Sequence, residues 1–179
     1  NYNADFSGQP RTLPNGVVYA TDKALKYTVK NYLKENYSIE KIFYFKRFNS
    51  EFTPYSLDDA YSAMFPNNKE TKDKKVVAKD LLSCLDIRLF GATFAKKARG
   101  NNIAISVHGP VQITHGANIW GENNFYSEQI MSPFRNPNDA SEDNAATTLG
   151  RQTKLHEGHY VHHISVNPKN LEDIVSLAG

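Results

Sequence analysis

The sequence contains little cysteine and no long apolar run. Its single cysteine, Cys84, cannot form an internal disulfide, so we expect a protein of a reducing compartment, the cytoplasm. Cys84 lies among apolar residues in helical spacing, where a thiol is typical of a packed core rather than of a nucleophile. No stretch approaches the roughly 20 apolar residues that a membrane-spanning helix needs, and no signal peptide is visible, so we expect no membrane partner.

A large charge of one sign is also absent. The 179 residues include 21 Lys and Arg against 19 Asp and Glu, a net charge of +2, which excludes a polybasic tail. A nucleic-acid site therefore has to come from local clusters of cations. Aromatic residues make up 12%, enough for both a core and a stacking surface. Because no Met and no opening strand precede Asn1, we expect the chain to be part of a longer protein.

A helical pattern occupies the middle of the chain. Val77, Leu81, Leu85 and Leu89 recur every four residues, which predicts one continuous helix with an apolar face. Gly91 follows, and because glycine has no Cβ it can end this helix in the left-handed conformation.

A strand pattern comes next. Apolar residues alternate through 103–107 and resume at Val111 and Ile113, which predicts strands on either side of Gly109-Pro110, at a bulge or a sheet edge. The basic segment 95–102 joins helix to strand, either as a hairpin tip near phosphates or as a plain loop.

These two patterns carry a family resemblance. The sequences Asp-Ile-Arg-Leu-Phe-Gly-Ala at 86–92 and His-Gly-Pro-Val-Gln-Ile-Thr-His-Gly at 108–116 resemble, in order and spacing, the Cas-seven family. This family is the repeated backbone subunit of type I CRISPR Cascade complexes, and the type I-B branch is the most similar. The resemblance extends from Asn1 to Leu177. It implies a non-catalytic protein without a cofactor, which binds CRISPR guide RNA.

The resemblance also implies partners and a mechanism. Copies of the chain would assemble along the guide, together with other Cascade subunits, in antiviral defence. Backbone contacts would hold the guide while its bases pair with target DNA, so that base pairing and not the protein reads the sequence.

The order of the expected elements predicts an α+β fold. Restoring a first strand gives a ferredoxin-like, RRM-like antiparallel sheet with helices on one face and long inserted loops, one of them thumb-like. We expect a single domain over 1–179 with insertions at about 35–80 and 117–154. The aromatic RNP motif of RNA-recognition sheets is absent, which argues against sequence-specific readout in that style.

The first expected helix opens at Thr21 or Asp22, with a buried stripe at Leu25, Val29 and Tyr32-Leu33. A row of lysines occupies another face of it. No carboxylate lies four residues after these lysines, so they are either a solvated face or, as the resemblance implies, contacts to the guide backbone.

Two further elements follow before the central helix. The aromatic and basic segment 41–48 predicts a half-buried strand, facing a core or stacking bases. Ser56 and Asp59 have the spacing of a capping box, which opens a short helix ending at Phe65.

Candidate RNA contacts follow mainly from the resemblance. Asn3 belongs to a polar loop that lies along the RNA in the family, or is a plain surface residue. Arg88 is either an RNA contact or an ion-pair partner for Asp86 or another acid. The full candidate set is Asn3, Thr21, Lys23, Lys26, Lys30, Arg88, His108, Gln112, Arg151 and Lys154.

Four histidines lie in the segment 155–166, which predicts one strand. Tyr160 replaces the second histidine of a His-Glu-x-x-His motif, and the strand places the histidines on both faces. We therefore expect no metal site, although a His-based metal protein remains an alternative. Asn167 and Pro168 then have the positions of N-cap and first residue of a helix.

A second alternative is an RNA-cleaving protein. The related type III backbone subunits cut RNA with an aspartate on the thumb loop, where Asp139 or Asp143 would lie in this sequence. Such cleavage needs a metal ion and an aligned water. The motif match favours the type I reading.

Overall fold

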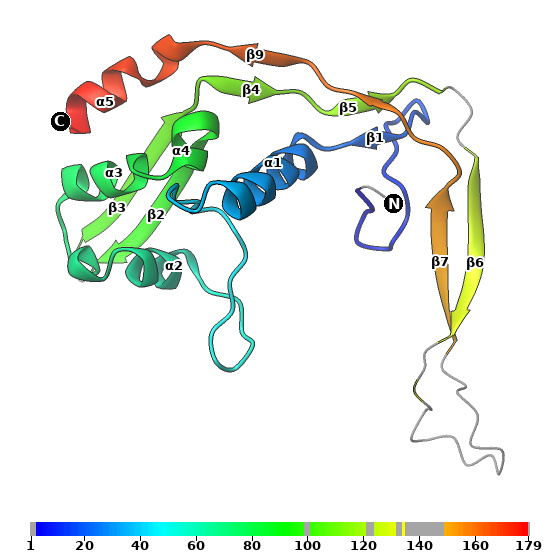
Figure 1. Cartoon of the computed structure of the whole chain (residues 1–179), viewed down its shortest axis with the longest axis horizontal. Coiled ribbons are helices and arrows are strands. Elements are labelled where there is room, and N and C mark those ends of the chain that lie inside the picture. Colours follow the sequence, from blue (N-terminus) through cyan, green and yellow to red (C-terminus); the bar gives the residue numbers. More distant parts are fainter. Residues whose placement is uncertain (1–2, 99–100, 121–123, 132–133, 135–148, 179) are drawn as a thin grey trace. The chain divides into compact units, whose positions relative to one another are not determined.

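The computed structural model describes residues 3–98, 101–120, 124–131, 134 and 149–178 (Figure 1). Within these residues there are five α-helices, two short 3-10 helices and nine strands, and the strands form four small antiparallel sheets. The predicted α+β class is therefore confirmed, whereas the ferredoxin-like order of the strands stays a prediction. No helix in this described part is long and apolar enough to cross a membrane.

The helical elements are α1 (Asp22–Asn36), α2 (Leu57–Met64), η1 (Pro66–Asn68), α3 (Lys74–Leu82), α4 (Leu85–Phe90), η2 (Pro168–Leu171) and α5 (Glu172–Ala178). The strands are β1 (Tyr19–Ala20), β2 (Gly91–Ala98), β3 (Asn101–His108), β4 (Val111–Ile113), β5 (Gly116–Asn118), β6 (Phe125–Met131), β7 (Leu149–Leu155), β8 (Tyr160–Val161) and β9 (Ile164–Val166). Their pairings are β1-β5-β8, β2-β3, β4-β9 and β6-β7.

The chain divides into two compact units. Unit 1 comprises residues 1–24 and 114–163, and unit 2 comprises residues 25–113 and 164–179. Each unit is thus built from two separate stretches of sequence. The predicted single domain with two insertions is not tested by this division.

The core of unit 2 lies on the hairpin of β2 and β3. Ile103, Ile105 and Val107 are buried while the residues between them are exposed, which confirms the predicted alternation. Phe94 of β2 is fully buried between the rings of Phe43 and Tyr61. The cluster contains Phe43, Tyr61, Phe65, Val77, Leu81, Cys84, Ile87, Phe94, Ile103, Ile105 and Val107.

The plain-loop reading of 95–102 is wrong, because β2 runs through Ala98 and pairs residue by residue with β3. Alanine and lysine have low strand propensity, so the composition concealed this strand. Lys96 even points inward: it is 5% exposed, its Nζ donates to the Lys69 carbonyl, and it lies 4.6 Å from the Tyr61 ring centroid. The turn at 99–100, the predicted basic tip, lies outside the described residues.

The continuous helix predicted over Val77–Leu89 is also wrong, because it is interrupted between α3 and α4. The Leu85 amide donates to the Lys41 carbonyl at 2.8 Å instead of continuing the helical pattern, and Cys84 pairs with Lys41 as an isolated bridge. The buried ridge consequently shifts. Cys84 and Ile87 are buried, whereas Leu85 and Leu89 are only half-buried.

Two glycines of the motif segments meet at the end of α4. Gly91 has φ +75° as expected for a glycine that ends a helix, but its ψ of 178° is extended, so the predicted left-handed helical conformation is wrong. A Cβ on Gly91 would lie 2.2 Å from the Val107 carbonyl oxygen, and one on Gly109 would lie 2.2 Å from the Gly91 nitrogen. Glycine at both positions therefore allows the backbones to touch.

The half-buried strand predicted for 41–48 is not formed. The amides of Phe43 and Tyr44 each donate at 2.8 Å to the buried carboxylate of Asp86, so no neighbouring strand accepts them. Ile42 and Phe43 are buried in succession, which an alternating strand does not allow. In contrast, the predicted capping box is confirmed, since Ser56 and Asp59 exchange both of its hydrogen bonds.

Helix α1 begins after Thr21 as predicted, but the prediction that it buries an apolar stripe is wrong. No residue of α1 is buried. Leu25, Val29 and Leu33 are half-buried, and Tyr32 is 57% exposed.

The strand predicted over 155–166 is two strands in different sheets. β8 pairs with β5 and β9 pairs with β4. The interruption falls at His162 and His163, which bind Thr114: the Thr114 amide donates to the His163 carbonyl, and the His163 amide donates to the Thr114 hydroxyl, both at 3.0 Å. The predicted cap at Asn167 is confirmed by its side chain, which accepts from the Lys169 amide at the start of η2.

Candidate nucleic-acid interface

The ten predicted RNA contacts do not form one cluster. Five lie in unit 1 and five in unit 2. In unit 1 they are Asn3, Thr21, Lys23, Arg151 and Lys154, and in unit 2 they are Lys26, Lys30, Arg88, His108 and Gln112. Each unit is therefore described by itself.

Two of the predicted residues of unit 1 contact each other. The Asn3 amide nitrogen donates to the Thr21 hydroxyl at 3.0 Å, and this hydroxyl also accepts from the Ala24 amide at 3.3 Å. Thr21 thus caps the start of α1 while Asn3 holds the N-terminal loop against it. Both side chains are half-buried, so their polar atoms already have structural roles.

The lysines of α1 differ in how they are held. Lys23 is exposed. Lys26 lies 5.6 Å from the Phe90 ring centroid, and Lys30 donates to the Tyr44 carbonyl at 2.6 Å. Burial lowers the pKa of Lys30, opposed by the nearby Asp86 carboxylate. The Tyr44 carbonyl therefore holds Lys30, whereas Lys23 and Lys26 remain candidates for phosphate contacts.

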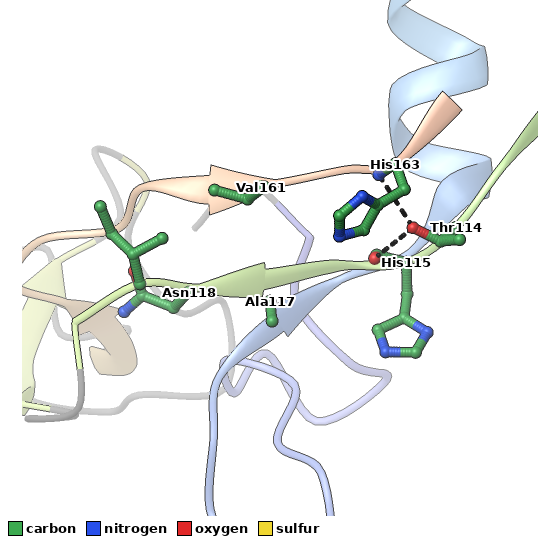
Figure 2. A pocket seen from close by; sticks show the side chains of 7 residues that line it. Thr114, His115, Ala117, Asn118, Val161 and His163 are labelled. Atoms are coloured by element: carbon green, nitrogen blue, oxygen red, sulfur yellow. Dashed lines mark hydrogen bonds between the residues drawn. The ribbon is translucent and has the colours of Figure 1, made fainter. Parts of the chain in front are cut away.

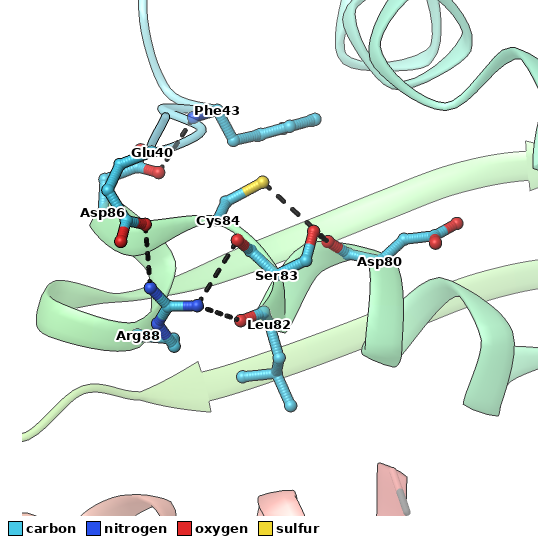
Figure 3. A network of polar contacts seen from close by, with 8 residues as sticks. All are labelled: Glu40, Phe43, Asp80, Leu82, Ser83, Cys84, Asp86 and Arg88. Atoms are coloured by element: carbon cyan, nitrogen blue, oxygen red, sulfur yellow. Dashed lines mark hydrogen bonds and ion pairs between the residues drawn. The ribbon is translucent and has the colours of Figure 1, made fainter. Parts of the chain in front are cut away.

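Arg88 forms an ion pair, as one of the two sequence readings expected, but its partner is Glu40 and not Asp86. The guanidinium lies 3.0 Å from the Glu40 carboxylate, and it also faces the carbonyls of Leu82 and Ser83 (Figure 3). Contact of Arg88 with RNA stays a prediction. Asp86 is instead the buried acceptor for the amides of 43 and 44.

The two candidates in the second motif are close in sequence and differ in exposure. His108 ends β3 and is exposed. Gln112 is half-buried, and its amide nitrogen donates to the Gly109 carbonyl at 2.7 Å. The motif residues Asp86, Gly91 and Gly109 therefore fix the join between α4, β2 and the strand that follows, rather than forming an evident ligand site.

The predicted thumb-like hairpin has a paired base. Strands β6 and β7 match residue by residue from Phe125 opposite Leu155 to Met131 opposite Leu149. Arg151 is exposed, whereas Lys154 binds the carboxylate of Glu128, and this hydrogen bond raises the pKa of Lys154. Apart from Phe134, residues 132–148 lie outside the described residues, and with them the aspartates Asp139 and Asp143.

Sequence reasoning missed the apolar surface of this hairpin. Phe125, Tyr126, Ile130 and Met131 of β6 are 43%, 44%, 45% and 66% exposed. They alternate over both faces of the ribbon, so each face presents exposed apolar side chains, although Thr153 of β7 is buried. Aromatic and aliphatic side chains exposed in a strand would be a signal for a binding surface, but the sequence alone does not show that both faces are open.

A pocket of about 380 Å³ lies along β5 and β8 in unit 1 (Figure 2). Ala117, Ile119 and Val161 give it an apolar lining, and the histidines 115 and 163 lie at it. Asn118 is 6% exposed there, and no described atom accepts a hydrogen bond from its Nδ2.

The histidines of this region serve structural contacts. His162 Nδ1 lies 2.9 Å from the Thr114 carbonyl oxygen, and His159 Nε2 lies 2.8 Å from the Glu157 carboxylate. In the described residues, no group of three or more His, Cys, Asp and Glu side chains is arranged to hold a metal ion. His162 and His163 thus fix the chain to Thr114 where β8 ends.

Comparison with known families decides the relationship. The sequence matches the family model of CRISPR-associated protein Cas7 over residues 1–177. The chain belongs to the Cas7 family. This membership implies a CRISPR-associated backbone subunit, associated with CRISPR RNA and other CRISPR-associated subunits. None of the curated proteins matches the chain. The motif residues that carry the resemblance to Cas7 are those that join α4 to the β2–β3 hairpin.

Proposed function

We propose that the chain is a non-catalytic backbone subunit of a type I Cascade complex, most similar to the I-B branch. Copies of it assemble along CRISPR guide RNA in the cytoplasm and present the guide for pairing with target DNA. The family match over residues 1–177 is the observation that carries this proposal. The ferredoxin-like, RRM-like arrangement of the sheet is part of the same proposal.

Two surfaces support the RNA contact. On α1, a helix that buries none of its residues, Lys23 is exposed and Lys26 is half-buried. On the hairpin, Arg151 is exposed beside apolar side chains of β6. Cations suit phosphates without regard to base identity, and aromatic rings stack on any base. Such contacts hold a guide of any sequence.

The first experiment is co-purification of RNA, followed by sequencing. Repeat-spacer RNA of uniform length, with several protein copies on each molecule, is the expected result. Random cellular RNA bound at the same level would contradict a guide-specific role. Cleavage of a complementary RNA that depends on Mg²⁺ and is lost in Asp139→Asn or Asp143→Asn would contradict the non-catalytic part and favour the type III alternative.

A second experiment locates the phosphate contacts. Replacing Lys23 and Lys26 together with Gln should weaken RNA binding and reduce the salt slope, d log K/d log[salt], by about 1–2 units. The matched control replaces Lys72 and Lys74 of the 69–75 segment with Gln. Lys74 is the first residue of α3, and Lys72 lies two residues before it. A salt slope unchanged by the α1 variant would show that this helix face meets solvent and not RNA.

A further inference from the structure

An exposed aromatic side chain stands at the tip of the loop between α1 and α2. Phe52 is 85% exposed. Its φ is +58°, and among the described residues it is the only one other than glycine with a positive φ. A bulky side chain in this region is a backbone outlier, and such outliers tend to persist at functional positions.

The loop that carries Phe52 is firmly built. The Asn49 side-chain oxygen accepts from the amides of Glu51 at 3.0 Å and Thr53 at 2.9 Å. The Asn49 amide donates to the Thr53 carbonyl, and the Phe52 amide donates to the Asn49 carbonyl. Phe48 and Pro54 form a bridge below this turn. These bonds present the ring at a fixed place, which lowers the entropy cost of inserting it into a partner.

The chemistry beside the ring favours a protein partner over nucleic acid. Glu51 precedes Phe52 and is exposed, so its carboxylate would face the phosphates of a strand stacked on the ring. Arg47 is turned inward and donates to the Ile42 carbonyl at 2.8 Å, so it does not offset Glu51 at the tip. The fitting partner surface has an apolar hollow and hydrogen-bond donors at its edge.

Unit 1 carries such a hollow, the pocket along β5 and β8. A cavity of about 150 Å³ already accepts benzene, so about 380 Å³ has room for a phenyl ring. Its wall includes Ile119 and Val161, which are 58% and 50% exposed. The imidazoles of His115 and His163 offer ring N–H donors, and there is no carboxylate among the described residues that line the pocket.

We propose that Phe52 of one copy inserts into the β5–β8 pocket of a second copy, with Glu51 facing the pocket's histidines. Loop and pocket are different surfaces of one chain, so the contact is heterologous and repeats from copy to copy as an open row. The inference rests on the proposed function in one respect, that copies of the chain assemble with one another. It identifies the two surfaces through which neighbouring copies make contact.

Cross-linking tests the contact directly. The protein with Thr53→Cys, which keeps the Phe52 ring and lies exposed beside it, is mixed with the protein with Val161→Cys, and a short bismaleimide is added. The native thiol Cys84 is fully buried and stays in every variant. We expect a covalent dimer in the mixture, at least about tenfold more than in either variant alone, because each variant carries only half of the contact.

The matched control is Ile39→Cys, which is 95% exposed and precedes the same loop. Mixed with Val161→Cys, it should give little dimer. Equal yields from Ile39→Cys and Thr53→Cys would overturn the proposal, since they would indicate random collision. An intramolecular product in the double variant Thr53→Cys/Val161→Cys, unchanged on dilution, would also overturn it and assign the pocket to the chain's own loop.

Two non-covalent variants follow self-association by sedimentation. Phe52→Asn removes the ring and retains a residue that tolerates φ > 0, and it should weaken association about tenfold. Glu51→Lys should weaken it too, and His163→Glu on the partner should restore it, because the new lysine then faces a carboxylate. Unchanged association in Phe52→Asn would contradict the contact.

RNA binding separates the two proposals. A short single-stranded RNA that accommodates one copy should bind Phe52→Asn as it binds the original protein. A clear loss would assign the ring to a nucleobase and overturn the protein contact. If neither protein binds RNA but cross-linking is specific, the contact stands and the proposed function fails. If RNA binding is normal but cross-linking is non-specific, the proposed function stands and the contact between copies fails.

Discussion

The two units of the molecule are stabilised in different ways. In unit 2, eleven buried residues form one cluster around Phe94. In the described part of unit 1, the buried apolar side chains are Pro10, Val18 and Ala20, and two further buried side chains, Asn118 and Thr153, are polar. Unit 1 therefore depends on backbone pairing and on polar contacts such as that of Gln9 with Thr153, 2.9 Å long.

This difference indicates which unit needs a partner. Burial of apolar area is the main stabilising contribution in folding, so unit 2 has its own source of stability. Unit 1 instead exposes the apolar side chains of β6 and the lining of its pocket. A ligand that binds only the folded form adds stability by mass action. We therefore expect RNA or neighbouring copies to stabilise unit 1 more than unit 2.

The largest effect should come from the core of unit 2. Phe94→Ala removes a fully buried ring between two others and should lower the free energy of unfolding by about 3–5 kcal/mol. Val18→Ala in unit 1 removes fewer buried atoms and should cost about 1.5–2 kcal/mol. Urea unfolding followed by circular dichroism measures both. Ile130→Ala, at a position 45% exposed, is the control and should change little. Equal losses from Phe94→Ala and Ile130→Ala would contradict the core described for unit 2.

The buried carboxylate of the first motif should come second. Asp86→Ala leaves the amides of Phe43 and Tyr44 without their acceptor, and a buried unsatisfied donor costs about 1–3 kcal/mol. We expect a loss of about 2–4 kcal/mol for the pair. Asp86→Asn keeps one acceptor oxygen and should lose less. If both variants lost the same amount, the hydrogen bonds would not be the cause.

Hydrogen exchange compares the units without mutation. Amides of β2 and β3 should exchange at least about 100-fold more slowly than those of β6 and β7, because local opening is easier where little apolar area is buried. Addition of guide RNA should slow exchange in β6 and β7. Equal protection of both hairpins in the free protein would remove the contrast between the units.

A thiol titration gives a smaller effect within unit 2. Burial, with a contribution from the Asp86 charge, raises the pKa of Cys84 from 9.0 to about 12. The unfolded chain loses this proton first, so the free energy of unfolding falls as pH rises from about 9 to 12. Between pH 8 and 10 the fall should be about 1 kcal/mol. Tyr44 and Tyr61, whose pKa values are also raised, act in the same direction. The difference between the original protein and Cys84→Ala isolates the thiol, and parallel pH profiles for the two would contradict its burial.

The smallest effect should come from the surface ion pair of unit 2. Glu40 and Arg88 are 38% and 41% exposed, and exposed pairs contribute about 0.2–1 kcal/mol. Glu40→Gln should therefore change stability by less than about 1 kcal/mol, and less again at high salt. Because Glu40→Gln leaves the Arg88 guanidinium without its carboxylate partner, the affinity for RNA is measured as a second readout. A large loss of stability would mean that this pair, and not only the core, holds α4.

Local signals in the sequence predicted local structure well. Ser56 with Asp59, and Asn167 with Pro168, are hydrogen-bonding or steric preferences that act within a few residues, and both are found. The alternation in β3 was readable for the same reason, since a strand with one buried face repeats every two residues.

The failures involve partners that are distant in sequence. The break before α4 depends on a carbonyl at Lys41, and the irregular path of 41–48 depends on Asp86. The site suffers from the same limit. A cation row on α1 was visible, but only the fold reveals that Lys30 donates to the Tyr44 carbonyl and that Arg88 pairs with Glu40.

The division of each unit into two stretches of sequence has a consequence for synthesis. The first 24 residues of unit 1 leave the ribosome long before residues 114–163, which complete it. The 89 residues between them, 25–113, belong to unit 2, whose own last stretch begins only at Ile164. Strand β1 therefore has no β5 to pair with while most of unit 2 is synthesised. The nascent chain therefore carries two incomplete units at once, until the residues from Ile164 onward are made.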